Sequence, residues 1–222
     1  MGKLISIEGI DGSGKNTQTH LLVNNLRELG FSVATIAFPQ YQSNFFGKEV
    51  GNYLNGKFGG LDEIHPKLAA MLYAGDRFES KSTILNLIEQ NDFLICDRYT
   101  PSNIAHQSAK FSNEHEKLEF INWLSALEYE IYGLPKPTAN IFLNVPPYFS
   151  DRLVELKEKR SYTNKTKDLH EENKEYLLNV YGQFLKLANT ENNWYVIECV
   201  NDSQLRSVDS IASELLRIVQ QL

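Results

Sequence analysis

The sequence Gly9-Ile-Asp-Gly-Ser-Gly-Lys15 directly follows the apolar run Leu4-Ile-Ser-Ile7 and directly precedes a stretch with helical periodicity. Glycines in such a loop let backbone N–H groups close around phosphate oxygens, and the N-terminus of the next helix adds partial positive charge. A lysine in this register reaches the β- and γ-phosphates. The stretch therefore predicts a phosphate-binding loop over residues 9–17 and a nucleoside triphosphate as its ligand. The residues expected to contact the triphosphate are Gly9, Gly12, Ser13, Gly14, Lys15, Asn16 and Thr17.

The residue after this lysine departs from the usual pattern, which places a Ser or Thr hydroxyl there to bind Mg²⁺. Asn16 occupies that position, and Thr17 comes one residue later. An amide oxygen can contact a hard cation, but a water molecule could do so equally well. The sequence leaves the ligands of the metal on this side open, whereas phosphate binding rests on the backbone and Lys15.

The composition indicates one domain with a small polyanionic ligand. A length of 222 residues suits a single large domain, 1–222, and the net charge of −6 argues against a general nucleic-acid or anionic-membrane surface. The chain has two cysteines, each at the end of an apolar run, and no apolar run approaches eighteen residues. We therefore expect a cytoplasmic protein that binds neither nucleic acid nor membrane.

Apolar runs typical of strands alternate along the chain with stretches of helical periodicity, a pattern that favours a parallel sheet with helices on both faces. The expected strands are 3–8, 32–37, 93–96, 139–143 and 194–198. The first helix carries Leu22, Leu26 and Leu29 on one stripe and is expected to stop at Gly30. The other expected helices are 65–90 (as two), 101–109, 114–132, 148–157, 171–189 and 204–220. The fold class predicted is α/β, a five-stranded parallel sheet of the P-loop type.

One polar, basic segment interrupts the regular pattern. Residues 157–168 read KEKRSYTNKTKD and have no hydrophobic period. Such a segment is either an ordinary solvated connection or a lid, extending over about 157–170, that closes over phosphates. The pattern alone does not decide between the two.

An acid and a base emerge together where the run Phe93-Leu-Ile-Cys96 ends in Asp97-Arg98-Tyr99. The carboxyl end of a buried parallel strand is where α/β sheets place their ligands. Asp97 could organise Mg²⁺ through water, and Arg98 could hold a second phosphate with two hydrogen bonds. The alternative, a simple ion pair at the end of a strand, is less favoured because a phosphate loop is expected at the same carboxyl edge of the sheet.

These motifs together resemble the thymidylate kinase family, over nearly the whole chain. The matching segments are EGIDGSGK (8–15), FPQY (38–41), Gly47 with YL (53–54), YAGDR (73–77), DRYTPSN (97–103) with Gln107, GLPKP (133–137) and DLHE (168–171). The resemblance implies transfer of the γ-phosphoryl group of ATP to thymidine monophosphate (dTMP), for DNA precursor synthesis, with Mg²⁺ as cofactor. It also implies a homodimer, for which the helices at 65–80 and 101–132 are plausible elements.

The same resemblance implies roles in catalysis. Asp11 would lie at the acceptor end of the reaction and, with Asp97, near the metal, the latter through water. Lys15 would neutralise charge on the transferring group, and Arg98 would hold the monophosphate in line. One branch of the family carries a basic residue in the phosphate loop where this chain has Gly12. The basic segment must then supply that charge, from Arg160, Lys165 or Lys167, and we favour Arg160 because a guanidinium suits a planar clamp.

For the base, the resemblance assigns stacking to Tyr73, an apolar wall to Phe38 and a hydrogen bond to thymine O4 to Arg77. His106 stands where some relatives have a tyrosine beside the 2′-carbon of the sugar. The full set expected to contact dTMP is Asp11, Phe38, Tyr41, Tyr73, Arg77, Arg98, Ser102, Asn103, His106, Gln107 and His170.

Two other interpretations remain open. The first is a different nucleoside or nucleoside monophosphate kinase, because these enzymes share the loop, the Asp-Arg pair and the lid. Arg77 and the Phe38-Pro39 segment argue against it. The second is a nucleotide-binding regulatory protein that has lost catalysis, an interpretation based on Asn16 in place of the usual Ser or Thr. Release of ADP with and without dTMP separates the two classes.

Overall fold

The computed structural model describes residues 2–61, 63–150 and 173–222. Five parallel strands form one sheet in the order β2-β3-β1-β4-β5, which confirms the predicted fold class. The strands are β1 (Lys3–Glu8), β2 (Val33–Ala37), β3 (Phe93–Asp97), β4 (Ala139–Asn144) and β5 (Trp194–Glu198), each within one residue of its predicted bounds. The strand β1 lies at the centre, so the loop that follows it opens at the middle of the carboxyl edge.

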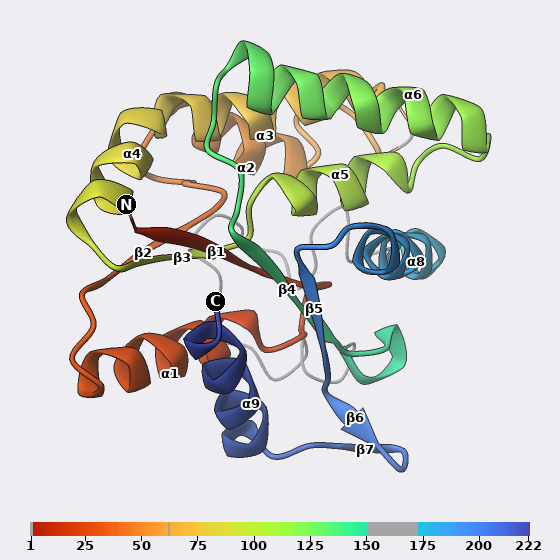
Figure 1. Cartoon of the computed structure of the whole chain (residues 1–222). Helices are drawn as coiled ribbons and strands as arrows, with labels where there is room; N and C mark the ends of the chain where they lie inside the picture. Colours follow the sequence, from red (N-terminus) through yellow and green to blue (C-terminus); the bar gives the residue numbers. More distant parts are fainter. Residues whose placement is uncertain (1, 62, 151–172) are drawn as a thin grey trace.

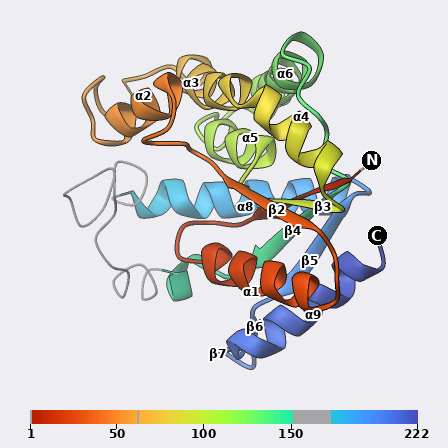
Figure 2. The same cartoon turned by 90° about the vertical axis from the view of Figure 1, so that its left-hand side faces the viewer.

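Helices cover both faces of the sheet, as Figures 1 and 2 show. On one face lie α1 (Lys15–Glu28) and α9 (Val208–Gln220), and on the other lie α4 (Lys81–Gln90), α5 (Thr100–Ser108) and α8 (Lys174–Thr190). Successive residues of a strand point to opposite faces, and the core follows this rule. Ile5 and Ile7 of β1 pack with Leu22 of α1, whereas Leu4 packs with Ile84 of α4.

A further layer of helices lies outside α5, formed by α2 (Phe45–Leu54), α3 (Pro66–Glu79) and α6 (Glu114–Ser125) (Figure 2). Close packing explains why α2 contains glycine. A Cβ atom on Gly47 would lie 2.1 Å from the carbonyl oxygen of Gln40, and one on Gly75 of α3 would lie 2.6 Å from the ring of Phe46. The two helices therefore approach each other and the loop before α2 more closely than larger residues would allow.

The first helix ends as predicted. Gly30 has φ +90° and donates its N–H to the carbonyl of Arg27, while Phe31 donates to Leu26. These two bonds form the glycine-terminated cap in which the chain turns away after the last helical residue.

Three expectations for the secondary structure were wrong. The helix α2 was not predicted at all. The predicted helix 114–132 is not one α-helix, because α6 continues into a π-helical turn, η1 (Ala126–Ile131). The predicted helix 204–220 begins only at Val208, capped by Ser207, and a short hairpin of β6 (Val200–Asn201) and β7 (Gln204–Leu205) precedes it.

The expected helix 148–157 and the predicted lid at about 157–170 lie largely or wholly outside the described residues. Within the described part of the chain, no helix is both long enough and apolar enough to cross a membrane.

Candidate active site

The loop after β1 has the geometry that phosphate binding requires. Gly9, Gly12 and Gly14 all have positive φ, between +82° and +152°, where residues with a side chain are strained. A Cβ atom on Gly9 would also lie 3.1 Å from the carbonyl oxygen of Leu143. Helix α1 begins directly after Gly14, which supplies no capping side chain, and its first turn has no acidic residue. The N–H groups of that turn are therefore available to an anion.

Lys15 opens this helix with its side chain folded back over the loop. Its ammonium donates to the carbonyl of Ile10 at 2.8 Å and to the hydroxyl of Ser13 at 3.3 Å, and the residue is buried. Phosphate oxygens could replace these two contacts without a large movement of the backbone of Lys15.

Arg98 lies beside the loop, at the end of β3. Its backbone has φ +67°, a sparsely populated conformation for a residue with a side chain, and its N–H donates to the carbonyl of Ile7. The guanidinium donates from Nη1 to the carbonyl of Gly9 at 2.9 Å and to the hydroxyl of Ser102 at 3.0 Å, and from Nη2 to Asp11 at 2.6 Å. Contacts with β1, with the phosphate loop and with α5 thus hold Arg98 in place.

Glu8 supports this arrangement from the end of β1. The fully buried carboxylate accepts from the N–H of Tyr99 at 2.9 Å and from the hydroxyl of Ser102. Burial raises the pKa of Glu8 to about 7, although these hydrogen bonds and the charge of Arg98 act in the opposite direction. Glu8 therefore titrates near neutral pH, unlike a surface carboxylate.

A cavity of about 60 Å³ adjoins Arg98. Ten of the eleven residues expected to contact dTMP line it, namely Asp11, Phe38, Tyr41, Tyr73, Arg77, Arg98, Ser102, Asn103, His106 and Gln107, together with Pro39, Leu54 and Tyr99. They come from the phosphate loop, the loop after β2, α3, the end of β3 and α5. The eleventh, His170, lies outside the described residues.

At one end of this cavity, Arg77 of α3 forms a buried ion pair that the sequence did not predict. Its Nε and Nη2 atoms donate to the two carboxylate oxygens of Glu128, both at 2.6 Å. Burial works against the charge of the guanidinium, but the charge of Glu128 more than offsets this, so the pKa of Arg77 is raised. Among the described residues, Glu128 thus occupies Nε and one N–H of Nη2, and the predicted hydrogen bond from Arg77 to thymine O4 would have to come from its other N–H groups.

His106 lies in the wall of the same cavity. Its Nδ1 atom is 3.2 Å from the hydroxyl of Tyr176 on α8, and its ring packs edge-on against Phe184. Burial, assisted by the positive charges of Arg98 and Lys15, lowers the pKa of His106 to about 3. The imidazole is therefore neutral at physiological pH, and its predicted place beside the sugar remains a prediction.

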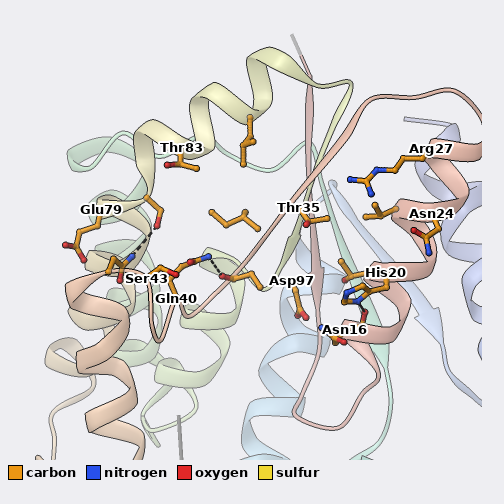
Figure 3. A pocket seen from close by; sticks show the side chains of 17 residues that line it. Asn16, His20, Asn24, Arg27, Thr35, Gln40, Ser43, Glu79, Thr83 and Asp97 are labelled. Carbon is orange, nitrogen blue, oxygen red and sulfur yellow. Dashed lines mark hydrogen bonds between the residues drawn. The ribbon is translucent and has the colours of Figure 1, made fainter. Parts of the chain in front are cut away.

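The residues predicted to face the metal lie on two neighbouring hollows. Asp11 lines the cavity, whereas Asn16 and Asp97 line a more open groove beside β2, where Figure 3 shows both at one end. Among the described residues, no group of three or more His, Cys, Asp or Glu side chains could hold a metal ion. One carboxylate and one amide oxygen nevertheless suit Mg²⁺, which usually takes one or two protein ligands and completes its shell with phosphates and water.

The same groove runs along the outer edge of β2, between α1 and α4 (Figure 3). Arg27 donates to the carbonyl of Val33 at 2.8 Å, and Gln40 donates to the carbonyl of Ala37 at 2.8 Å. Side chains thus cover part of the open edge of the sheet.

The structure says less about the remaining predicted site residues. Asn16 and Thr17 are exposed in the first turn of α1. The residues proposed for the lid, Arg160, Lys165 and Lys167, lie outside the described residues.

Sequence reasoning overlooked the buried carboxylates of Glu8 and Glu128, although each left a signal. Glu8 is the last residue of an apolar strand and lies on the same face of the sheet as Leu4, so an acid occupies a position where an apolar residue is expected. Glu128 follows Phe120 and Leu124 at helical spacing, so an acid occupies a position where the pattern calls for an apolar residue.

A phosphate loop, an arginine fixed beside it and a cavity with aromatic walls at the carboxyl edge of a parallel sheet define a P-loop nucleotide-binding protein. The chain belongs to the thymidylate kinase family, because the family model for thymidylate kinase matches residues 7–211.

Individual relatives agree with this assignment. The thymidylate kinase of Mycobacterium tuberculosis is 37% identical over 142 residues, which cover 64% of this chain and 65% of that relative, just under two thirds of each. The probable thymidylate kinase of Methanocaldococcus jannaschii is 33% identical over 214 residues, covering 96% of this chain and 93% of the relative. The solved structure of thymidylate kinase from Candida albicans superimposes with a TM-score of 0.76 at 26% identity, covering 99% of this chain and 92% of that one.

Proposed function

We propose that this protein transfers the γ-phosphoryl group of ATP to dTMP and forms dTDP. The observation that carries the proposal is the cavity itself. Ten residues from five segments of the chain, all expected to contact dTMP, line one hollow, and among them Arg98 lies beside the phosphate loop. Membership of the thymidylate kinase family supports the same acceptor.

On the donor side, the first-turn N–H groups of α1 and the ammonium of Lys15 would bind the phosphates of ATP. Phosphoryl transfer needs positioning and charge stabilisation rather than a covalent intermediate with the protein. Lys15 would release Ile10 and Ser13 and follow the negative charge that develops on the transferring group.

On the acceptor side, Arg98 would hold the phosphate of dTMP. Its guanidinium is already oriented by Gly9, Ser102 and Asp11, so little conformational freedom remains to be lost on binding. Phe38 and Tyr73 would enclose the base between apolar surfaces, with Arg77 at its polar edge. Arg160 remains our proposal for the additional positive charge at the transition state.

The residues that would hold Mg²⁺ are Asp97 and Asn16, on the groove side, and Asp11, in the cavity. When bound, the ion supplies positive charge that offsets the charge of the phosphates. The chain's own contribution is to present these oxygen atoms next to the loop and to keep Arg98 paired to Asp11 until the substrates bind.

A panel of acceptors tests the proposal. ADP release from Mg-ATP should be measured with dTMP, dUMP, dCMP, dGMP and AMP, and without acceptor. We expect dTMP to give the highest kcat/KM. A higher kcat/KM for AMP or dGMP would indicate another nucleoside monophosphate kinase, and ATP binding without ADP release would indicate a regulatory protein.

We also propose that the enzyme is a homodimer that uses the outer face of α3 and α6. Leu68, Met71 and Phe78 lie on one stripe of α3 and are 42–59% exposed, and Leu118 of α6 is 57% exposed. Exposed apolar side chains on neighbouring helices are typical of a protein interface. Leu118→Glu should convert the dimer to a monomer in sedimentation equilibrium, whereas Glu119→Lys, which changes the neighbouring polar residue, serves as the matched control. A wild-type protein that sediments as a monomer would refute this.

We place the enzyme in the cytoplasm. Cys96 and Cys199 are both free thiols and both buried, which suits a reducing compartment.

A further inference from the structure

Glu128 occupies an unusual place next to the cavity. It lies on the π-helical turn η1, is fully buried, and is absent from the cavity lining. Its carboxylate nevertheless accepts four hydrogen bonds. The donors are Arg77 Nε (2.6 Å) and Thr100 Oγ1 (2.8 Å) to Oε2, and Arg77 Nη2 (2.6 Å) and Asn103 Nδ2 (2.9 Å) to Oε1. Two of its three partner residues, Arg77 and Asn103, do line the cavity.

The first consequence concerns the side-chain amide of Asn103. Its Nδ2 atom donates to Glu128 and also to the carbonyl of Ala70 at 3.0 Å. Both partners can only accept, so reversing the amide would set its oxygen against two other oxygens. The orientation of the amide is thereby fixed. Its Oδ1 atom is left buried without a partner among the described residues, in a residue that lines the cavity.

The second consequence concerns Arg77, which can only donate. Among the described residues, Glu128 accepts from Nε and from one of the two N–H groups of Nη2, so the donors that Arg77 can offer to the cavity are its other N–H groups. The pair therefore offers a ligand only donors on Arg77 and one acceptor on Asn103. Gln107 differs, because both polar atoms of its buried amide lack a partner among the described residues, so either orientation is open to it.

This combination matches one type of pyrimidine edge. Thymine and uracil present an acceptor at O4 and a donor at N3, whereas cytosine presents a donor at N4 and an acceptor at N3. A buried site built for one polarity strongly rejects the opposite one, because both partners are left without hydrogen bonds.

We propose that Glu128 is a specificity-determining positioning residue, which contacts no substrate but holds the guanidinium of Arg77 in place and fixes the amide orientation of Asn103, so that thymine is accepted and cytosine is rejected. This inference rests on the proposed function, because it assumes that the cavity holds the base of dTMP.

The test compares dTMP with 5-methyl-2′-deoxycytidine monophosphate, which has nearly the same shape but the opposite edge polarity. Dissociation constants are measured by calorimetry for the wild type and for Glu128→Gln. We expect the wild type to prefer dTMP by about 10³-fold or more, and the variant to lose at least about tenfold of that preference. The preference for dTMP over dUMP should not change, because these two bases share the same polarity.

Glu8→Gln is the matched control, since it also replaces a buried carboxylate, but one that contacts Tyr99 and Ser102 instead of the base-reading pair. It should keep the ratio between dTMP and the cytidine analogue. The inference is overturned if a folded Glu128→Gln protein keeps the wild-type ratio, or if the wild type binds both ligands equally.

A second variant decides the matter if Glu128→Gln does not fold. Asn103→Ala removes the acceptor but leaves the pair of Arg77 and Glu128 in place. It should weaken dTMP at least about tenfold and leave the cytidine analogue unchanged, whereas equal losses would overturn the inference. Failure of the proposed function looks different, because the wild type would then release no ADP with dTMP.

Discussion

Replacing Glu8 by glutamine should make the stability of the protein less dependent on pH. The carboxylate is fully buried at the end of β1, and burial raises its pKa from 4.5 to about 7. Glutamine has nearly the same shape, can still accept the hydrogen bond from the N–H of Tyr99, and carries no charge at any pH. The substitution therefore removes the cost of a buried charge with little change in packing.

The sign follows from proton linkage. A raised pKa means that the folded state binds the proton more tightly than the unfolded state, so stability is lost as the pH rises from about 4.5 to about 7. For these two values, the loss between pH 5 and pH 8 is about 2–3 kcal/mol, because one pKa unit corresponds to about 1.36 kcal/mol. Above pH 7, Glu8→Gln should thus be more stable relative to wild type than it is at pH 5, by about that amount.

Urea unfolding followed by tryptophan fluorescence at pH 5, 6, 7 and 8 measures this difference. His106 acts in the opposite direction, because its lowered pKa costs stability as the pH falls below 6.5. It is present in both proteins, however, and its contribution cancels when the two are compared. A difference between the variants that stays constant from pH 5 to pH 8 would show that Glu8 does not titrate in this range.

Two further predictions concern catalysis and sugar selectivity. Lys15→Ala should lower kcat by about 10²- to 10³-fold and leave the Kd for dTMP nearly unchanged, because the ammonium acts on charge that develops in the transition state. Steady-state kinetics measure kcat, and calorimetry measures the Kd. An unchanged kcat would remove Lys15 from the mechanism. Because the pKa of His106 is about 3, the ratio of kcat/KM for dUMP to that for UMP should be constant from about pH 5.5 to about pH 8, and His106→Tyr should raise it. If the same ratio is found in both proteins, His106 does not face the sugar.

The sheet and the phosphate loop could be predicted because their signals are local. Five apolar runs separated by helical periodicity define a parallel sheet, and the glycines with Lys15 define the loop. The helix α2 was missed for a different reason. Its two glycines, Gly47 and Gly51, weaken the helical pattern, and Gly47 is required by a contact with Gln40 that no local pattern reveals.

The residues expected to bind dTMP could be located from the family resemblance, but their interactions with one another could not. Arg77 was predicted to bind the base, and it does line the cavity, yet its main partner is Glu128, 51 residues further along the chain. This changes how the residue should be studied. Arg77→Ala would leave a buried carboxylate unpaired, at a cost of about 3–5 kcal/mol, and would confuse loss of recognition with loss of stability.

The covered edge of β2 bears on how the protein behaves when it is concentrated. A parallel sheet has two open margins, and an exposed strand at a margin can recruit the same strand of a neighbouring molecule. Here Arg27 and Gln40 occupy the carbonyl groups of Val33 and Ala37, four residues apart on a strand of only five. An incoming strand would have to displace both side chains before its own N–H groups could bond. The sheet therefore offers other molecules a poor template for aggregation on this side.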